Sequence, residues 1–542
     1  MAMLGEFGLR AEADRGSRSS IERLPAARAA FVGRTLRGPV NEPRLIVSFT
    51  QFQQVFGGLW QPSPLGYAVE QFFDNGGQEA YIVRVANGAR PASVTLPAGD
   101  GQALVLHAAR PGTREFLRVC IDYDNLPADD PAAFNLAVQR VRSAGAVHVE
   151  DQEIHRELSV RPDAPRYAPR VLAASQLVRA DAPVPRTRPL RTIDRGSGLA
   201  TGYVHSNADG DDGAPLSDYD LIGSEIDATG LFALRDEHFF NFLCIPPIAR
   251  ERDLGVQTLV VAARLCRERR ALLIVDPPGA WNTAGEALAG LRAWGFRSED
   301  AALYFPRLLA YDKLRGRFET FAPCGAAAGL LARRDSQTPV WQADETDDPV
   351  LRPGYKPACP VNETERARLA AAGVNTLQAV RAAARRALPA RTFASAGAVD
   401  GGGLAARRSV PYIIHCIERG TRWAAAAARE VDTAAVLEAQ VRGFLTELHQ
   451  AGAFAGRSLD DAFFLKCPVA AGPGGEAAHP VRSIHFLVGL AAARQGEFHC
   501  FRIIHGAAGS EVRGVTLNRL RDLRASPAEI EWADRIADQL RC

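Results

Sequence analysis

The stretch Phe31–Val85 reads FVGRTLRGPVNEPRLIVSFTQFQQVFGGLWQPSPLGYAVEQFFDNGGQEAYIVRV and is the most informative part of the chain. Short apolar runs at Ala29–Gly33, Leu45–Val47 and Ala80–Val85 predict three strands. Apolar residues at helical spacing predict a helix after the second strand, and Pro64–Phe73 predicts another. Glycine and proline mark each corner, so the stretch is expected to form a compact α/β unit. None of its residues has the setting of a catalyst.

The ends of the first helix are marked by residues that favour helix termination. Ser48 or Thr50 can accept a hydrogen bond from the first turn and cap the amino end. Gly57 and Gly58 follow the apolar face and predict the carboxyl end, because glycine tolerates the left-handed conformation that closes many helices.

Size and composition describe a globular protein of several domains. The 542 residues exceed one ordinary core, so two to four domains are expected. The chain is 47% hydrophobic and 23% charged, with a formal net charge of +2. That balance gives no bulk attraction to nucleic acid or to an anionic membrane. Met1–Arg10 lacks the basic start and apolar run of a signal peptide, and no apolar run is long enough to span a membrane.

Cysteine usage favours a reducing compartment. The nine cysteines are dispersed and odd in number, and no two are spaced as C-x-x-C. We interpret them as reduced, mostly buried thiols of a cytosolic product, and not as a disulfide framework or a zinc site.

The patterns predict an α+β and α/β multidomain chain with an extended arm before its first strand. The expected segments are an arm at 1–28, an α/β segment at 29–100, a β-rich segment with a Pro/Gly/Asp loop at 101–222, an α/β middle domain at 223–345, a linker with helices at 346–403, an α+β C-terminal domain at 404–506 and an extension at 507–542.

Beyond the opening unit, apolar periodicity predicts further elements. Expected helices are Val256–Arg270, Thr283–Trp294, Glu363–Ala371, Thr376–Ala387, Leu404–Glu418, Ala434–Gln450 and Pro527–Leu540. Expected strands are Ala103–His107, Phe116–Tyr123, Phe134–Val141, Ala271–Asp276, Phe463–Cys467, Ile484–Leu490 and Phe498–Ile504.

Searches for catalytic and ligand-binding motifs find little. The chain has no G-x-x-x-x-G-K-[ST], H-E-x-x-H or G-x-S-x-G motif, and we expect no cofactor and no metal site. Asp276 ends a predicted strand in an α/β pattern, which is a usual place for a catalytic carboxylate. The two prolines that follow favour a turn-capping role instead. The densest basic run, from Arg381 to Arg408, is either a solvated helix face or a surface that meets an acidic partner.

Several blocks of sequence, in order, carry a family resemblance. They include FVGRTLRGP and YAVEQFFDNGGQEAYIVRV in the opening unit, YAPRVLAASQLVR, and then DYDLIGSEIDATGLFAL and LLIVDPPGAW. The C-terminal blocks are RRSVPYIIHCIERGTRW, VRGFLTELHQAGAFAG, DDAFFLKC and GEFHCFRI. Over about residues 25–506 the chain resembles the contractile tail sheath family of myophages and phage-tail-like injection systems.

The resemblance implies a structural protein and not an enzyme. Sheath subunits stack as hexameric rings around a rigid inner tube, and contraction triggered at the baseplate drives the tube outward. The expected partners are therefore further copies of this chain, the tube protein, and baseplate and cap or terminator proteins, without direct nucleic-acid contact or membrane insertion. Assembly is expected in the bacterial cytoplasm, and the product is a virion tail or an injection particle.

The resemblance also implies roles for particular residues. The arm and the last family strand would add to sheets of neighbouring subunits, and the domain at 404–506 would face the tube. Strand-exchange candidates are Phe7, Leu9, Phe498, Phe501 and Ile503. Tube-facing candidates are Arg385, Arg386, Arg407, Arg408, Arg422 and Arg442.

Two departures from the family pattern leave alternatives open. The arm lacks the usual Pro-Gly-Val-Tyr-x-Glu-Glu start, and residues 507–542 continue beyond the usual final strand. Either departure is compatible with a specialised relative, such as a cap, a terminator or a baseplate-proximal subunit. An alternative of another class is an α/β enzyme built on the strand that ends at Asp276. It predicts a deep pocket with perturbed acids there.

Overall fold

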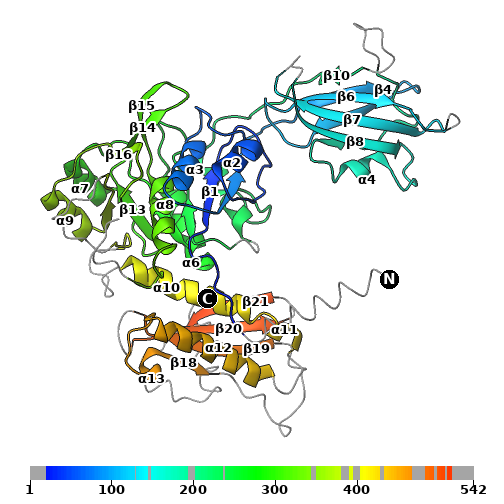
Figure 1. The fold of residues 1–542 in the computed structure, drawn as a ribbon. Coiled ribbons are helices and arrows are strands. Elements are labelled where there is room, and N and C mark those ends of the chain that lie inside the picture. Colours follow the sequence, from blue (N-terminus) through cyan, green and yellow to red (C-terminus); the bar gives the residue numbers. More distant parts are fainter. Residues whose placement is uncertain are drawn as a thin grey trace.

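The computed structural model shows three domains (Figure 1). It describes residues 20–127, 130–143, 148–192, 202–235, 239–342, 350–379, 390–394, 403–427, 433–466, 483–492, 497–506 and 509–515. An α/β domain occupies the middle, a β domain projects from it, and the C-terminal domain lies below. The predicted mixture of α/β, β-rich and α+β parts is confirmed.

A seven-stranded sheet forms the centre of the α/β domain. Its order is β17-β13-β12-β11-β1-β3-β2, and every pairing is parallel except that of β2 with β3. The strands are β1 (Ala29–Gly33), β2 (Arg44–Ile46), β3 (Ala80–Arg84), β11 (Phe242–Cys244), β12 (Leu272–Val275), β13 (Ala301–Phe305) and β17 (Val374–Thr376). The sheet therefore unites the segments predicted at 29–100 and 223–345, because β1 lies directly between β3 and β11.

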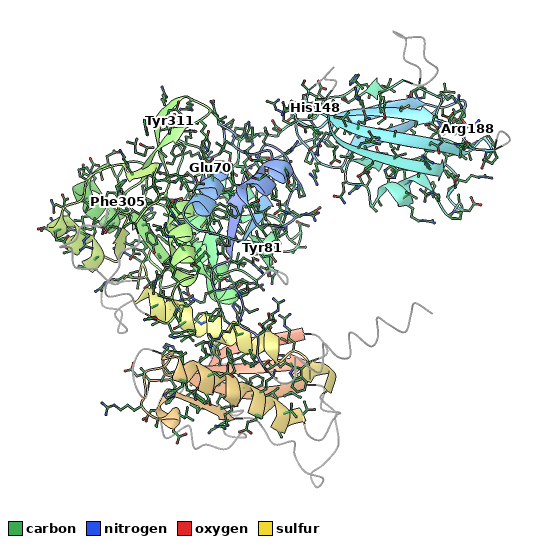
Figure 2. All side chains as sticks on the ribbon, in the orientation of Figure 1. Glu70, Tyr81, His148, Arg188, Phe305 and Tyr311 are labelled. Carbon is green, nitrogen blue, oxygen red and sulfur yellow. The ribbon has the colours of Figure 1, made fainter. Side chains whose placement is uncertain are left out.

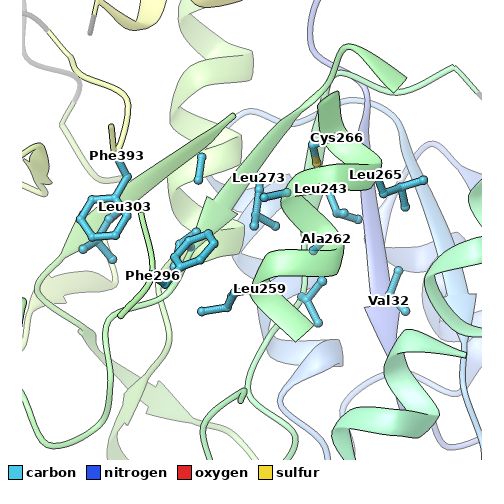
Figure 3. Close-up of a cluster of buried hydrophobic side chains, with 14 of the residues drawn as sticks. Val32, Leu243, Leu259, Ala262, Leu265, Cys266, Leu273, Phe296, Leu303 and Phe393 are labelled. Carbon is cyan, nitrogen blue, oxygen red and sulfur yellow. The ribbon is translucent and has the colours of Figure 1, made fainter. Parts of the chain in front are cut away.

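Helices cover both faces of this sheet, which explains its nearly continuous apolar strands. One face packs against α2 (Phe49–Phe56), α3 (Leu65–Asp74) and α8 (Cys324–Asp335). The other packs against α5 (Asp218–Ile222), the short helix η1 (Gly230–Leu234), α6 (Val256–Arg269), α7 (Ala284–Ala293) and α9 (Glu363–Ala371). Figure 3 shows α6 crossing the sheet, with Leu259 and Ala262 directed toward Leu243 and Leu273.

The capping residues act as the sequence predicts. The Ser48 side chain accepts a hydrogen bond from the backbone N–H of Gln51, and Gly57 ends α2 with φ of 90°. Glycine also permits close helix packing elsewhere, since a Cβ on Gly325 of α8 would lie 1.9 Å from the carbonyl oxygen of Ala68 in α3. A small sheet of β14 (Leu308–Asp312), β15 (Arg317–Phe321) and β16 (Tyr355–Pro357) adjoins the face of the central sheet that α2, α3 and α8 cover.

The β domain is inserted between β3 and α5. Its strands are β4 (Ser93–Pro97), β5 (Ala103–Ala108), β6 (Phe116–Asp122), β7 (Ala133–Val141), β8 (Val149–Ser159), β9 (Val178–Ala180) and β10 (Val204–His205), with helix α4 (Ala168–Leu172). Sheets β10-β6-β7-β8 and β4-β5-β9 enclose one apolar core. Two antiparallel segments, joined by the bridge between Asn87 and Ala214, connect it to the α/β domain. Figure 2 shows Arg188 toward the end of this domain that lies away from the rest of the chain.

The C-terminal domain is a four-stranded antiparallel sheet with helices on one face. Its elements are α10 (Leu404–Gly420), α11 (Ala424–Ala427), α12 (Thr433–Gln450), α13 (Leu459–Ala462), β18 (Phe463–Lys466), β19 (Ser483–Leu490), β20 (His499–Gly506) and β21 (Gly509–Val515). The strand order follows the chain. The apolar stripes of α10 and α12 pack against Phe486, Val488 and Ile503.

Most predicted elements are found, with a few differences. β21 lies in what the sequence pattern indicates is a polar tail, and Thr376 ends strand β17 instead of beginning a helix. The rest of the helix predicted to Ala387 and the helix predicted at Pro527–Leu540 fall mainly or wholly outside the described residues.

Six of the seven described cysteines are buried, as predicted. No helix in the described part of the chain is long and apolar enough to cross a membrane.

Candidate assembly interface

The last residues of the arm are bound to the C-terminal domain before they enter β1. Ile21 is buried among side chains of α10 and α12. Gln440 Nε2 donates to the carbonyl oxygen of Ser20 at 3.2 Å, and the Tyr412 hydroxyl donates to that of Leu24 at 3.0 Å. The chain before Ser20 therefore leaves from the C-terminal domain. Residues 1–19, with the strand-exchange candidates Phe7 and Leu9, lie outside the described residues.

Arg408 joins the C-terminal domain to the α/β domain. Its side chain is 5% exposed and forms an ion pair with Asp335 of α8, whose side chain is 1% exposed. The Arg408 guanidinium also donates to the carbonyl oxygen of Ala26 at 3.3 Å and lies 4.6 Å from the ring centre of Phe242. One buried cation thus holds α10, α8, β11 and the end of the arm together.

Arg407 makes a second link across the same boundary. It pairs with Asp300, whose side chain is 3% exposed, and donates to the carbonyl oxygen of Ala271 at 3.3 Å. From the α/β side, Arg270 donates to the carbonyl oxygen of Val512 in β21 at 3.3 Å. Figure 1 shows α10 lying along this boundary. Arg407 and Arg408 are therefore committed to contacts within the chain.

The other tube-facing candidates differ in their surroundings. Arg422 and Arg442 are 54% and 52% exposed, and each pairs with a glutamate one turn earlier on its own helix. The Arg442 pair is exposed on both sides, whereas Glu418 is 11% exposed, but the guanidinium of each arginine is accessible to a partner. Arg385 and Arg386 lie outside the described residues.

The C-terminal sheet changes the expectation for the strand-exchange residues. β20 pairs with β19 on one side and with β21 on the other, so neither of its edges is open within this chain. Ile503 is fully buried and Phe501 packs against the same core, so both serve the domain's own interior. Phe498 lies just before β20, with its ring 5.2 Å from that of Phe464. Within the described residues, the edges without a strand partner are those of β18 and β21.

A buried histidine connects β21 to the helices. His505 Nε2 lies 2.7 Å from the Thr421 hydroxyl, and Nδ1 lies 2.7 Å from the Ser510 hydroxyl of β21. Because the Thr421 hydroxyl donates to the carbonyl oxygen of Ile417 at 2.6 Å, His505 Nε2–H is the donor to Thr421, and Nδ1 accepts from Ser510. This arrangement requires a neutral ring, and burial lowers the pKa of His505 to about 4.

Asp276, the residue on which the enzyme alternative depends, caps a helix. Its Oδ1 accepts a hydrogen bond from the backbone N–H of Cys324, the first residue of α8, at 2.6 Å. Burial raises the pKa of Asp276 to about 7, and a cavity of about 210 Å³ adjoins it. The pocket with a perturbed acid is therefore present. The Cys324 thiol interacts with this carboxylate, and burial raises the pKa of that thiol. The residues lining the cavity include no histidine, cysteine, serine or lysine, and the described residues contain no cluster of three metal-ligating side chains.

Comparisons with known proteins find similarity in structure and not in sequence. No family model matches the chain, and no curated protein matches it. A sheath tail protein from Listeria innocua is similar with a TM-score of 0.55 at 10% identity, over 91% of this chain and 98% of that one. A sheath tail protein from Desulfitobacterium hafniense gives 0.48 at 12% identity, over 90% and 97%. An extracellular contractile injection system, described as the PVC sheath complex in the contracted state, gives 0.49 at 15% identity, over 89% and 92%.

Replacing Arg408 by methionine should destabilise the junction between domains. The change leaves the Asp335 carboxylate buried without its cation, which typically costs about 3–5 kcal/mol. The measurement is urea unfolding of the full chain, followed by tryptophan fluorescence. The double variant Arg408→Met with Asp335→Leu should recover most of the loss, because it removes both charges. Arg442→Met, at an exposed pair, is the control and should change stability by less than about 0.5 kcal/mol. An equal, small effect of both single changes would contradict the assigned role.

The stability of the C-terminal domain should depend on pH through His505. Its pKa in the folded chain lies below the ordinary value of about 6.5, so the unfolded chain binds the proton more tightly. Above about pH 6.5 the ring is neutral in both the folded and the unfolded chain, so it costs no stability. As the pH falls from there toward about 4, the free energy of unfolding decreases. Lowering the pH from about 7.5 to about 5 should cost about 2 kcal/mol more in the wild type than in His505→Gln. Parallel stability profiles of the two proteins would refute the prediction.

Proposed function

We propose that this chain, which has the fold of a sheath tail protein, is the structural subunit of a contractile sheath. The observation that carries the proposal is the structural similarity to the Listeria innocua sheath tail protein, which extends over 91% of this chain and 98% of that one. The subunits would stack as hexameric rings around an inner tube and shorten together to drive the tube outward. The proposed partners are other copies of the chain, a tube protein, and baseplate and cap proteins.

The arm supports this proposal through the place where it leaves the fold. Its anchored end, at Ser20–Leu24, lies on α10 and α12 of the domain that carries the open edges of β18 and β21. We propose that residues within Glu6–Ala13 add as a strand to one of these edges on a neighbouring subunit. Main-chain pairing at a sheet edge suits a sheath, since it links subunits through the backbone while they reorient.

The domain junction supports a division between rigid and movable parts. Arg407 and Arg408 fix the C-terminal domain to the α/β domain through two buried carboxylates. Contraction would then move whole subunits against one another, with the flexible connections located in the exchanged segments. We propose that assembly takes place in the bacterial cytoplasm and that the product is a tail or an injection particle.

A second candidate is a specialised subunit that ends a stack. β21 already occupies one side of β20, where a sheath subunit without this strand has an open edge. Covering this side of β20 within the chain is compatible with a cap or terminator, and it leaves β21 as the new edge strand of the sheet. Electron microscopy of the purified protein distinguishes the two, because a main sheath subunit forms long striated tubes and a terminator forms single rings.

Removing residues 1–19 should abolish tube formation without unfolding the chain. The deletion leaves Ile21 and the other anchored contacts in place, so the free energy of unfolding should stay within about 0.5 kcal/mol of the wild type. Negative-stain microscopy and size-exclusion chromatography provide the measurements.

A variant in which a Gly/Ser sequence of equal length replaces residues 1–19 is the matched control for chain length, and it should also fail to form tubes. Tubes of normal length from either variant would show that the arm is not the exchanged element.

Reversing two exposed charges of the C-terminal domain should weaken binding to an acidic tube surface. Arg422→Glu with Arg442→Glu replaces two accessible cations and should reduce co-assembly of sheath and tube, with a smaller difference at high salt. Co-sedimentation of the two proteins is the assay. Arg264→Glu is the control, because Arg264 is 78% exposed and pairs one turn away with Glu268, but lies on α6 of the α/β domain. Equal co-sedimentation of all three proteins would exclude these arginines from the tube interface.

A further inference from the structure

The α/β domain contains an apolar cavity at the carboxyl end of its central strands. The cavity has a volume of about 210 Å³ and lies where β11 and β12 end, with α6 and the loop before it on one side. Its walls include Ile245, Leu254 and Leu259 together with the indole of Trp294. Leu259 of α6 and Leu273 of β12, both labelled in Figure 3, also line the cavity. In open parallel sheets, ligands bind at this end of the strands.

One buried carboxylate oxygen in the lining lacks a hydrogen-bond donor. Oδ1 of Asp276 accepts a hydrogen bond from the backbone N–H of Cys324, and the Cys324 thiol also interacts with this carboxylate. Oδ2 is buried and has no partner with good hydrogen-bond geometry among the described residues. A buried acceptor without a donor costs free energy. A ligand that donates a hydrogen bond to Oδ2 would therefore be bound more tightly.

The charged side chains that line the cavity are both acidic. Asp253 and Asp276 are the charged residues that line it. Asp253 is already engaged, since it pairs with Arg307 and accepts from the backbone N–H of Gly279 at 2.7 Å. Arg307 in turn donates to the carbonyl oxygen of Pro277 at 3.1 Å and stays outside the lining. The remaining acceptor is therefore an anionic group surrounded by apolar walls and an indole.

We propose that this cavity binds a small organic amine in its ammonium form, with Asp276 Oδ2 accepting a hydrogen bond from the ammonium and the apolar walls enclosing the hydrocarbon. The size fits a short alkyl or benzyl group, since an apolar cavity of about 150 Å³ holds a benzene molecule. The Trp294 indole lines the same cavity, and aromatic rings attract organic cations. The proposal is independent of sheath assembly, because the site lies inside one domain of one chain.

The protonation state of Asp276 gives the binding a pH dependence. Burial raises its pKa to about 7, while the groups that face it are Arg307, Asp253 and the Cys324 thiol. The amine is protonated throughout the neutral range, so the carboxylate must ionise for the pair to form. Binding should therefore tighten as the pH rises from about 6 to about 8.

The test is isothermal titration of the full chain with n-butylammonium and benzylammonium chloride. Saturable binding of at least one cation at pH about 8 is expected, with butan-1-ol, the neutral analogue, binding more weakly. Asp276→Asn should weaken binding about 10- to 100-fold, the range expected for a lost hydrogen bond to a charged group. The asparagine oxygen can still accept from Cys324, so α8 keeps its cap. Asp124→Asn, at an exposed residue of the β domain, is the matched control and should bind like the wild type.

A second variant tests the cavity without touching the acid. Leu254→Phe places a larger side chain in the lining and should reduce binding while Asp276 is unchanged. Thermal unfolding checks that each variant is folded. No saturable binding of either cation to the wild type, equal binding of butanol and butylammonium, or unchanged affinity in Asp276→Asn would each overturn the proposal.

Discussion

The contact between Arg408 and Asp335 holds the parts of this chain in one arrangement. It connects a helix of the C-terminal domain to a helix of the α/β domain, and it also binds the end of the arm through Ala26. Two charges are buried to make it, which is favourable only when their geometry and remaining hydrogen bonds are satisfied. Arg407 and Asp300 repeat the arrangement one residue away. The position of the arm, the orientation of the C-terminal sheet and the access to its edges all depend on this boundary.

The elements of the fold were largely readable from the sequence, whereas their arrangement was not. Runs of apolar residues and helix-capping residues are local features of the sequence. The strands β1 and β3 and the ends of α2 could therefore be predicted from a few residues each. The central sheet depends on pairing between distant strands. β1 lies between β3 and β11, and an entire domain is inserted between those two strands. When a strand is apolar and buried on both faces, its sequence does not indicate which other strands it will pair with.

The candidate site shows the same limit at single residues. The arginines from 381 to 408 form one basic run in the sequence, yet Arg408 is buried. Its burial could not be predicted locally, because its acidic partner is 73 residues away in the chain. β21 was missed because its residues are polar and glycine-rich, and it is ordered mainly by pairing with β20. The capping role of Asp276 was predictable from the prolines that follow it. The capped helix was not, since it begins 48 residues later.

A rigid junction constrains how a chain of this shape can take part in a contractile assembly. If the domains were joined loosely, movement of the C-terminal domain would be absorbed within the chain and would not reach the outer domains. With Arg407 and Arg408 both paired across the boundary, a displacement of the C-terminal domain carries the α/β domain with it. In the proposed sheath, subunits would then be linked through segments outside this junction. Strand pairing at sheet edges suits such a link, because it is specified by the backbone and survives reorientation of the domains that it joins.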